Sequence, residues 1–168
     1  MTLVDEQKGL SVDRRRLRRL VRSTLRGEKV RRAAEVTVVV SGDTRLSELC
    51  RRFLGRARRT DVLAFAGGGR SAEPGARDLG EVVVNADRAR REARRRRIDP
   101  EAELFLYVVH GLLHLVGYDD RAEEDARRMR AREAAVLRRF GYPSVFDAPV
   151  VRATCGAAAP GCQQTAGD

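Results

Sequence analysis

The two histidines of this chain, His110 and His114, lie four residues apart in the segment VVHGLLHLVGYDDR. Residues with this separation share one face of a helix, so both imidazole rings are expected to point the same way. The run from Leu104 to Val116 around them is otherwise apolar on every side, which predicts a buried helix. Because a buried polar group without a partner is unfavourable, and because a metal ion would bind one nitrogen of each ring, the pair predicts a metal site.

A third ligand is expected just past the end of this helix. Gly117 ends the helix and lets the chain fold back, and Asp120 follows six residues after His114. The pattern H-x-x-x-H-x-x-G-x-x-D therefore predicts two imidazoles and one carboxylate around the ion, with the fourth position open, as in catalytic zinc sites. The neighbouring Asp119 is an alternative third ligand, and one of the two acids is expected to cap the next helix.

The histidine spacing also has two other interpretations. Zinc peptidases use the same spacing, but they carry a glutamate directly after the first histidine as general base. Here that residue is Gly111, so peptidase activity is not expected. Alternatively, the two rings are core histidines that ordinary hydrogen bonds satisfy, in which case no metal binds.

Arginine dominates the charge of the chain. The net charge is +10, and of the 34 basic residues only Lys8 and Lys29 are lysine. A surface this positive favours polyanions, RNA first among them, although a GC-rich genome can produce the same arginine excess. The three cysteines form no C-x-x-C pair, and their odd number argues against a disulfide framework.

The sequence gives no indication of a membrane partner. Residues 1–16 lack the apolar core of a signal peptide. The longest apolar run is shorter than the roughly 20 residues that a helix needs to span a bilayer. We therefore expect a cytoplasmic protein.

The elements that must position the motif are a mixture of helices and strands. Strands are expected over three apolar or β-branched segments: 35–40, 60–66 and 79–85. Helices are expected at five places: from Ser11 or Asp13, from Asp43 or Thr44, over 86–97, from Asp99-Pro100 through the apolar run, and over 121–139.

The motif and the segments around it resemble a known family. HGLLHLVGYDD resembles the signature H-G-x-L-H-L-x-G-Y-D-H of the YbeY-type rRNA maturation factors, which are bacterial zinc-dependent endoribonucleases. TDVLAF (60–65) matches the T-D-V-L-S-F strand of that family, and LGEVVV (79–84) matches its L-G-D-I strand. The likeness covers about residues 35–143.

The resemblance implies a fold and a domain organisation. The fold class is α+β: a single compact domain with a small mixed β-sheet, surrounding helices and a buried central helix that bears the metal. We expect this YbeY-like metal-dependent domain over residues 1–147. Residues 148–168 lack periodicity and are predicted to form a disordered tail.

The resemblance also implies an activity. His110, His114 and Asp120 would bind one zinc ion and would be the catalytic residues. The chain would cleave single-stranded RNA, mature the 3′ end of 16S rRNA and act in 70S ribosome quality control. Its partners would be rRNA and the small ribosomal subunit, with no nucleotide cofactor.

Three positions depart from the family pattern where the site is expected. The third ligand of the family is a histidine, and Asp120 stands there in this chain. A carboxylate can bind zinc, but its charge is expected to weaken the pull of the metal on a phosphate. Leu54 replaces an arginine that the family places before the TDVL strand, and Cys50 replaces an asparagine.

Arginines elsewhere are the predicted RNA contacts. Arg51, Arg52 and Arg56 surround the position of the missing family arginine, and Arg91, Arg94 and Arg95 belong to the basic helix 86–97. The arginine face of the first helix is a further candidate, because guanidinium groups bind phosphates bidentately. Alternatively, these arginines only form a solvated surface, and dissolved salt screens their attraction for nucleic acid.

Two other functions remain open from the sequence. One is a non-enzymatic factor of ribosome assembly that binds rRNA and has a degenerate or structural zinc site. The other is a generic α+β domain with core histidines.

Overall fold

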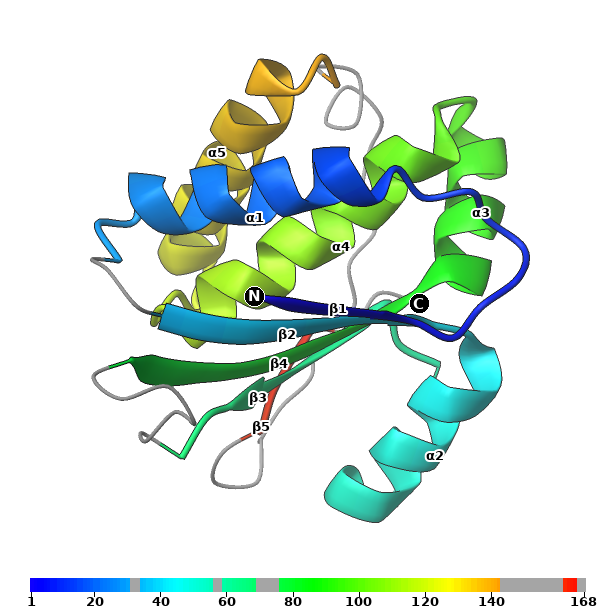
Figure 1. The fold of residues 1–168 in the computed structure, drawn as a ribbon, viewed down its shortest axis with the longest axis horizontal. Helices are drawn as coiled ribbons and strands as arrows, with labels where there is room; N and C mark the ends of the chain where they lie inside the picture. Colours follow the sequence, from blue (N-terminus) through cyan, green and yellow to red (C-terminus); the bar gives the residue numbers. More distant parts are fainter. Residues whose placement is uncertain (31–33, 56–58, 69–75, 143–161, 166–168) are drawn as a thin grey trace.

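The domain is built on a mixed β-sheet (Figure 1). In the computed structural model, residues 1–30, 34–55, 59–68, 76–142 and 162–165 are described. The strands are β1 (Thr2–Asp5), β2 (Ala34–Ser41), β3 (Val62–Ala66), β4 (Arg77–Asn85) and β5 (Cys162–Thr165), in the sheet order β1-β2-β4-β3-β5. Strands β1, β2 and β4 are parallel, whereas β3 runs antiparallel to both β4 and β5.

Helices cover both faces of the sheet (Figure 1). The helices are α1 (Arg14–Gly27), α2 (Asp43–Leu54), α3 (Ala86–Arg96), α4 (Pro100–Leu115) and α5 (Glu123–Arg139). On one face, Val62, Val82 and Val84 pack with α1, α4 and α5 into the larger core. On the other face, Leu63 and Val83 pack with α2. The alternation of β-strand side chains thus supplies both cores, and the predicted α+β fold is confirmed.

Helix α4 is the central helix of the larger core. Asp99 caps its start by accepting a hydrogen bond from the backbone N–H of Glu101, and Pro100 occupies the first turn. At Gly111 the helix lies so close to the sheet that a Cβ atom there would stand 2.5 Å from Cγ1 of Val82. The glycine therefore serves the close approach of the helix to the sheet.

Several local expectations need correction. Asp13 caps α1, as one alternative predicted, but α2 and α5 begin after Gly42 and Ala122, neither of which makes a side-chain cap. The expectation that Asp119 or Asp120 caps α5 is therefore wrong. Strand β1 was not expected at all, because only one of its four residues is buried and no alternation is visible.

The predicted tail falls mainly outside the described residues. Within 148–168, only 162–165 are described, and they form β5 at the edge of the sheet beside β3. The rest of the predicted tail lies outside the described residues, so its disorder stays a prediction. Among the described residues, no helix combines the length and the apolarity that crossing a bilayer requires.

Candidate metal centre

The end of α4 and the turn that follows it bring three candidate ligands together. His110 and His114 lie in the last turns of α4, with only 3% and 4% of their surfaces exposed. Gly117 then adopts a φ of 101°, a left-handed conformation that favours glycine, and the Tyr118 N–H donates to the carbonyl of Leu113. This turn reverses the chain and carries Asp120 back to the histidines.

The three side chains converge on one point. The Nε2 atoms of the two histidines are 3.1 Å apart. The carboxylate oxygens of Asp120 lie 3.8 Å from Nε2 of His110 and 3.9 Å from Nε2 of His114. Ligands about 2.0–2.1 Å from a tetrahedral zinc ion are about 3.4 Å from one another, so these separations fit a shared ion. Among the described residues, this trio forms a group that could hold a metal.

Both imidazole rings are oriented through their Nδ1 atoms. Nδ1 of His110 contacts the carboxylate of Glu133, which is fully buried on α5. Nδ1 of His114 lies 3.0 Å from the carbonyl oxygen of Tyr118 and donates to it. Since both partners are acceptors, each ring places an N–H at Nδ1 and directs Nε2 inward. Two ring nitrogens that face each other at this distance offer a shared position to a cation.

Burial keeps the second histidine neutral. Removal from water lowers the pKa of His114 to about 4, and the neighbouring His110 adds to this effect. The negative charge of the nearby Asp120 carboxylate raises the pKa of His114, but this effect is smaller than that of burial. His114 is therefore unprotonated at neutral pH, which is the form that binds a metal.

The two neighbouring aspartates have different environments. The Asp119 carboxylate accepts hydrogen bonds from the backbone N–H of Asp120 at 2.8 Å and from Nε of Arg121 at 2.7 Å. The Arg121 hydrogen bond lowers the pKa of Asp119. Asp119 thus stabilises the turn, while Asp120 faces the histidines. The sequence left open which acid joins them, and the turn geometry selects Asp120.

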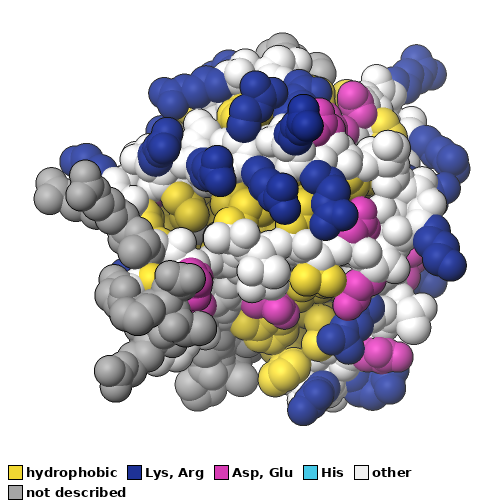
Figure 2. Space-filling view, viewed as in Figure 1, with side chains coloured by type: hydrophobic (Ala, Val, Ile, Leu, Met, Phe, Trp, Pro, Cys, Tyr) yellow, Lys and Arg dark blue, Asp and Glu magenta, His cyan; other side chains and the backbone are white. Residues whose placement is uncertain are grey.

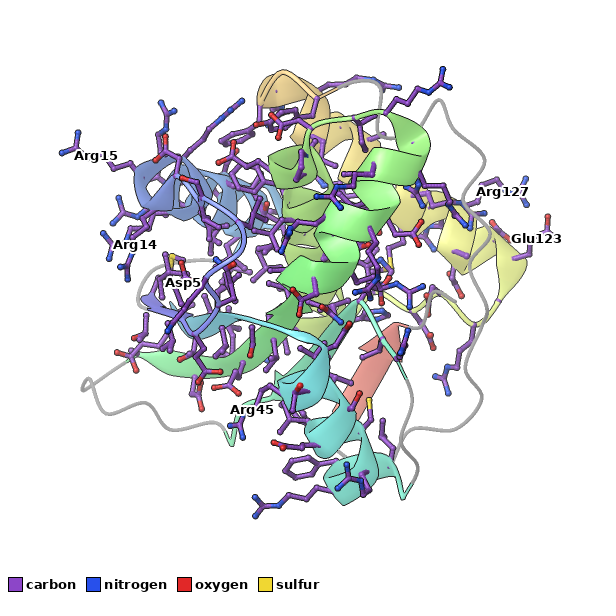
Figure 3. The ribbon with its side chains drawn as sticks, turned by 90° about the vertical axis from the view of Figure 1, so that its right-hand side faces the viewer. Asp5, Arg14, Arg15, Arg45, Glu123 and Arg127 are labelled. Atoms are coloured by element: carbon purple, nitrogen blue, oxygen red, sulfur yellow. The ribbon has the colours of Figure 1, made fainter. Side chains whose placement is uncertain are left out.

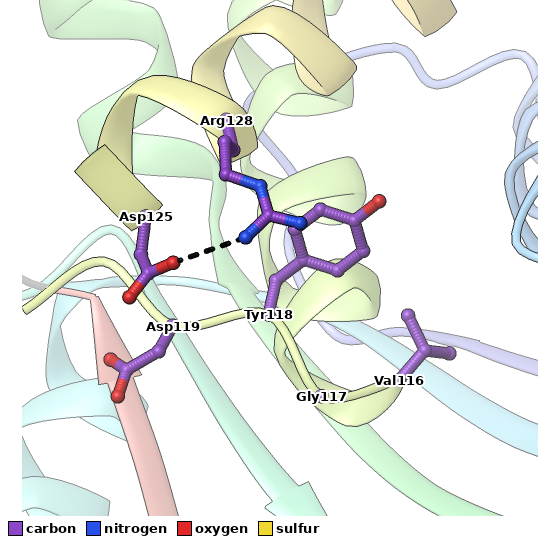
Figure 4. Close-up of a pocket in the computed structure, with 6 residues that line it drawn as sticks. All are labelled: Val116, Gly117, Tyr118, Asp119, Asp125 and Arg128. Atoms are coloured by element: carbon purple, nitrogen blue, oxygen red, sulfur yellow. Dashed lines mark ion pairs between the residues drawn. The ribbon is translucent and has the colours of Figure 1, made fainter.

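A hollow of about 350 Å³ opens beside this turn (Figure 4). Its lining comes from the turn and from the start of α5: Val116, Gly117, Tyr118, Asp119, Asp125 and Arg128. Nη1 of Arg128 lies 3.6 Å from the Asp125 carboxylate across the opening. The turn that carries Asp120 is therefore open to solvent on this side.

Arg51 and Arg52, two of the predicted RNA contacts, lie on the far side of the sheet from the histidines. Both are exposed in the last turn of α2. The guanidinium of Arg52 stands over the ring of Phe53, 5.4 Å from its centroid. Leu54 packs against the smaller core, and Arg56 lies outside the described residues. The structure does not bring Arg51 or Arg52 to the histidine pair, and their contact with RNA stays a prediction.

Helix α3, which carries the predicted contacts Arg91, Arg94 and Arg95, lies near the beginning of α4 and away from the histidine end of that helix (Figure 1). Arg91 forms a two-pronged contact with Asp43, at 2.7 and 2.9 Å. Arg95 lies 2.9 Å from Glu92, whereas Arg94 is exposed. Two of these three arginines are therefore already paired with carboxylates of the chain, and their contact with RNA also stays a prediction.

Glu133 is the site residue to which the sequence reasoning gave no role. It lies on the apolar face of α5 together with Met129 and Leu137, and all three are fully buried. A single acid on an otherwise apolar helix face was the available signal, because a buried charge needs a specific partner.

Comparisons with known proteins agree with this arrangement. The family model described as Endoribonuclease YbeY matches residues 2–141. Endoribonuclease YbeY of Chloroflexus aggregans is 38% identical over 147 residues, which make up 84% of this chain and 95% of that protein. Endoribonuclease YbeY of Geobacter sulfurreducens is 35% identical over 140 residues, or 82% of this chain and 93% of that protein.

Two further comparisons concern length and fold. Endoribonuclease YbeY of Anaeromyxobacter sp. is 44% identical over 109 residues, which are 64% of this chain and 55% of that protein. The chain thus spans little more than half of that relative. Among solved structures, the solution structure of TM1509 from Thermotoga maritima matches with a TM-score of 0.56 and 26% identity, over 88% of this chain and 97% of that one.

Proposed function

Because the chain belongs to the endoribonuclease YbeY family, we propose that it is a metal-dependent endoribonuclease that holds one zinc ion at His110, His114 and Asp120. The observation that carries the proposal is the convergence of two inward Nε2 atoms, 3.1 Å apart, with the Asp120 carboxylate. Zinc suits this donor set of two imidazoles and one carboxylate in a buried position.

The residues around the ion have separate tasks in this proposal. When bound, zinc supplies a Lewis acid that polarises a phosphate oxygen or a water molecule. The Glu133 carboxylate and the Tyr118 carbonyl hold the protons of the two imidazoles at Nδ1, so that both rings offer Nε2. Asp120 closes the set from the turn, where it remains a quarter exposed and leaves one side of the site to the substrate.

The biological setting follows from the family and is proposed on that basis. The substrate is single-stranded RNA, and the roles are maturation of the 16S rRNA 3′ end and 70S ribosome quality control in the cytoplasm. The partners are then rRNA and the small ribosomal subunit.

One observation favours a second candidate function. Leu54 takes the place of the family arginine and packs into the smaller core, so this position offers no charge to a phosphate. A chain with this change and with Asp120 as third ligand fits a factor that binds rRNA and keeps the metal for structure alone.

RNA cleavage before and after removal of metal decides between the two candidates. We expect purified protein with zinc to cleave a single-stranded oligoribonucleotide, and a chelator to abolish this activity until zinc is restored. His114→Ala should lower the rate of cleavage about a thousandfold or more, which corresponds to an increase of about 4 kcal/mol in the activation free energy. Arg127→Ala, on the exposed side of α5, is the control.

The outcomes separate cleanly when folding is monitored by circular dichroism. Cleavage that survives complete removal of metal contradicts the enzyme proposal. Zinc-loaded wild type that binds RNA but cleaves none supports the assembly factor.

A further inference from the structure

We propose that α1 carries a second RNA-binding surface, made of residues other than the metal ligands, which docks on the phosphate backbone of folded RNA. This proposal rests on the proposed function for the identity of its partner. The surface, named here the α1 arginine face, consists of the six exposed arginines of the helix: Arg14, Arg15, Arg18, Arg19, Arg22 and Arg26.

The arginines of α1 form a regular row. Arg14, Arg18, Arg22 and Arg26 recur at every fourth position, so they lie along one side of the helix. With a rise of about 1.5 Å per residue, successive members of the row are about 6 Å apart along the helix axis. This spacing is comparable with that of neighbouring phosphates along a nucleic-acid strand. A row of guanidinium groups can therefore follow a phosphate backbone without reading its bases.

The charge of this row is not balanced within the described part of the chain. The helix contains no acidic residue, and none of its six exposed arginines forms an ion pair with a described carboxylate. The side chain of Asp13 is engaged in capping the backbone N–H groups of Arg15 and Arg16. On α3, by contrast, Arg91, Arg95 and Arg96 each pair with an acid. The positive field of α1 is thus left for an external anion.

The placement of these arginines also disfavours the helix in isolation. Like charges four residues apart repel, and cations in the first turn oppose the helix dipole. The first turn of α1 holds Arg14, Arg15 and Arg16 and no acid. A bound polyanion would relieve both effects, which is the behaviour expected of a docking surface.

The α1 arginine face begins away from the metal centre and ends near it, because Glu28, just after α1, accepts a hydrogen bond of 2.9 Å from the Tyr118 hydroxyl in the turn. Lys and Arg side chains gather over α1 on the face shown in Figure 2. Figure 3 shows Arg14 and Arg15 on the opposite flank from Glu123 and Arg127, which follow the turn with Asp120. An RNA can therefore be held by its backbone along α1 while a single-stranded part of it reaches the metal.

A membrane surface is a less suitable partner than RNA. A basic amphipathic helix binds a bilayer by inserting its apolar face. In α1 that face is already inside the protein, because Leu17, Leu20 and Val21 are fully buried in the larger core. What remains for a partner is charge alone, which suits a phosphate backbone.

The test compares two pairs of exposed arginines on different helices in the zinc-loaded full chain. Arg18→Gln with Arg22→Gln removes the middle of the row, and Arg127→Gln with Arg138→Gln removes the same charge from the exposed side of α5. Binding to a folded rRNA fragment is measured over a range of salt concentrations. We expect the α1 pair to weaken binding about tenfold or more and to reduce the slope of log K against log salt by about 2. The α5 pair should change both much less.

Cleavage of a short single-stranded oligoribonucleotide distinguishes this proposal from the preceding one. Both double variants should cleave it as wild type does, because Arg18 and Arg22 are not among the metal ligands and a short strand lacks the folded backbone that would dock along α1. Equal weakening by the two pairs, or none by the α1 pair, would overturn the docking surface even if cleavage is intact. Tighter α1-dependent binding to phosphatidylglycerol vesicles than to RNA would also overturn it. Absent cleavage with an intact α1 effect would contradict only the enzyme.

Discussion

The two ends of α4 both bury polar groups, yet only one of them has the composition of a metal site. Near the first end, Glu103 is 1% exposed and lies 3.2 Å from Arg96, which is also buried. Burial raises the pKa of Glu103, and the Arg96 charge opposes that shift. This cluster contains its own cation, so its charge does not call for one from outside.

At the other end, the groups around the two histidines are acids. Asp120 and Glu133 carry two negative charges when ionised, and burial keeps the His114 ring neutral. A divalent cation would balance these two charges and satisfy the facing Nε2 atoms at once. The contrast teaches that burial of polar groups does not by itself indicate function. The distinguishing mark is a set of converging donors whose charge calls for a cation from outside.

The largest predicted effect is a loss of stability at the N-terminal end of α4, and it tests the comparison of the two ends. Arg96→Met leaves the Glu103 carboxylate buried without its cation, which should lower the free energy of unfolding by about 3 kcal/mol. The zinc content of the folded protein should stay unchanged. Arg95→Met is the control, since Arg95 is largely exposed and its pair with Glu92 is worth less than about 1 kcal/mol.

Urea denaturation of the zinc-loaded variants measures this effect. If Arg96→Met also lost its metal, the two ends would not be independent and the comparison would fail.

A smaller effect is expected from the buried acid at the metal end. Glu133→Gln keeps the size of the side chain but weakens the acceptor that holds the His110 proton at Nδ1. Zinc affinity should fall about 10- to 100-fold, as for other carboxylates that orient a metal-bound imidazole. Competition with a chromophoric chelator measures it, and Glu124→Gln on the exposed side of α5 is the matched control. Unchanged affinity would show that Glu133 is only a buried structural acid.

The smallest effect is expected in the middle of α4, where the helix approaches the sheet. A Cβ at Gly111 would stand 2.5 Å from Cγ1 of Val82 and 3.0 Å from Cγ2 of Val62. Gly111→Ala should therefore lower the free energy of unfolding by about 1–2 kcal/mol through overpacking. Combining it with Val82→Ala should give less than the sum of the two single losses, because the second change makes room. Strict additivity would mean that the predicted clash does not govern packing here.

Local signals in the sequence predicted much of the fold. The Asp99-Pro100 start of α4, the apolar run and Gly117 are all read from neighbouring residues, and the structure confirms the helix they predict. β1 and β5 were missed because each is only four residues long and depends on pairing with a strand distant in sequence. The start of α5 was misplaced because Asp119 and Asp120 are engaged elsewhere.

The candidate site also combines features that local sequence predicts with features that depend on distant contacts. The histidine pair follows from helical spacing, which is local. The choice of Asp120 depends on the path of a turn. The contact of Glu133 with His110 joins residues that lie 23 positions apart on two different helices. The pairing of Arg91 with Asp43 spans 48 residues and engages an arginine that the sequence offered as an RNA contact. Contacts of this range are set by packing, so residue spacing alone does not reveal them.

The zinc content of two neighbouring variants tests the central claim most directly. Asp119→Ala removes the acid that stabilises the turn, whereas Asp120→Ala removes the acid that faces the histidines. Measured by mass spectrometry on folded protein at limiting zinc, Asp119→Ala should retain about one ion per chain, as wild type does. Asp120→Ala should lose most of its zinc. Full zinc in Asp120→Ala, or none in the wild type, would contradict the metal centre.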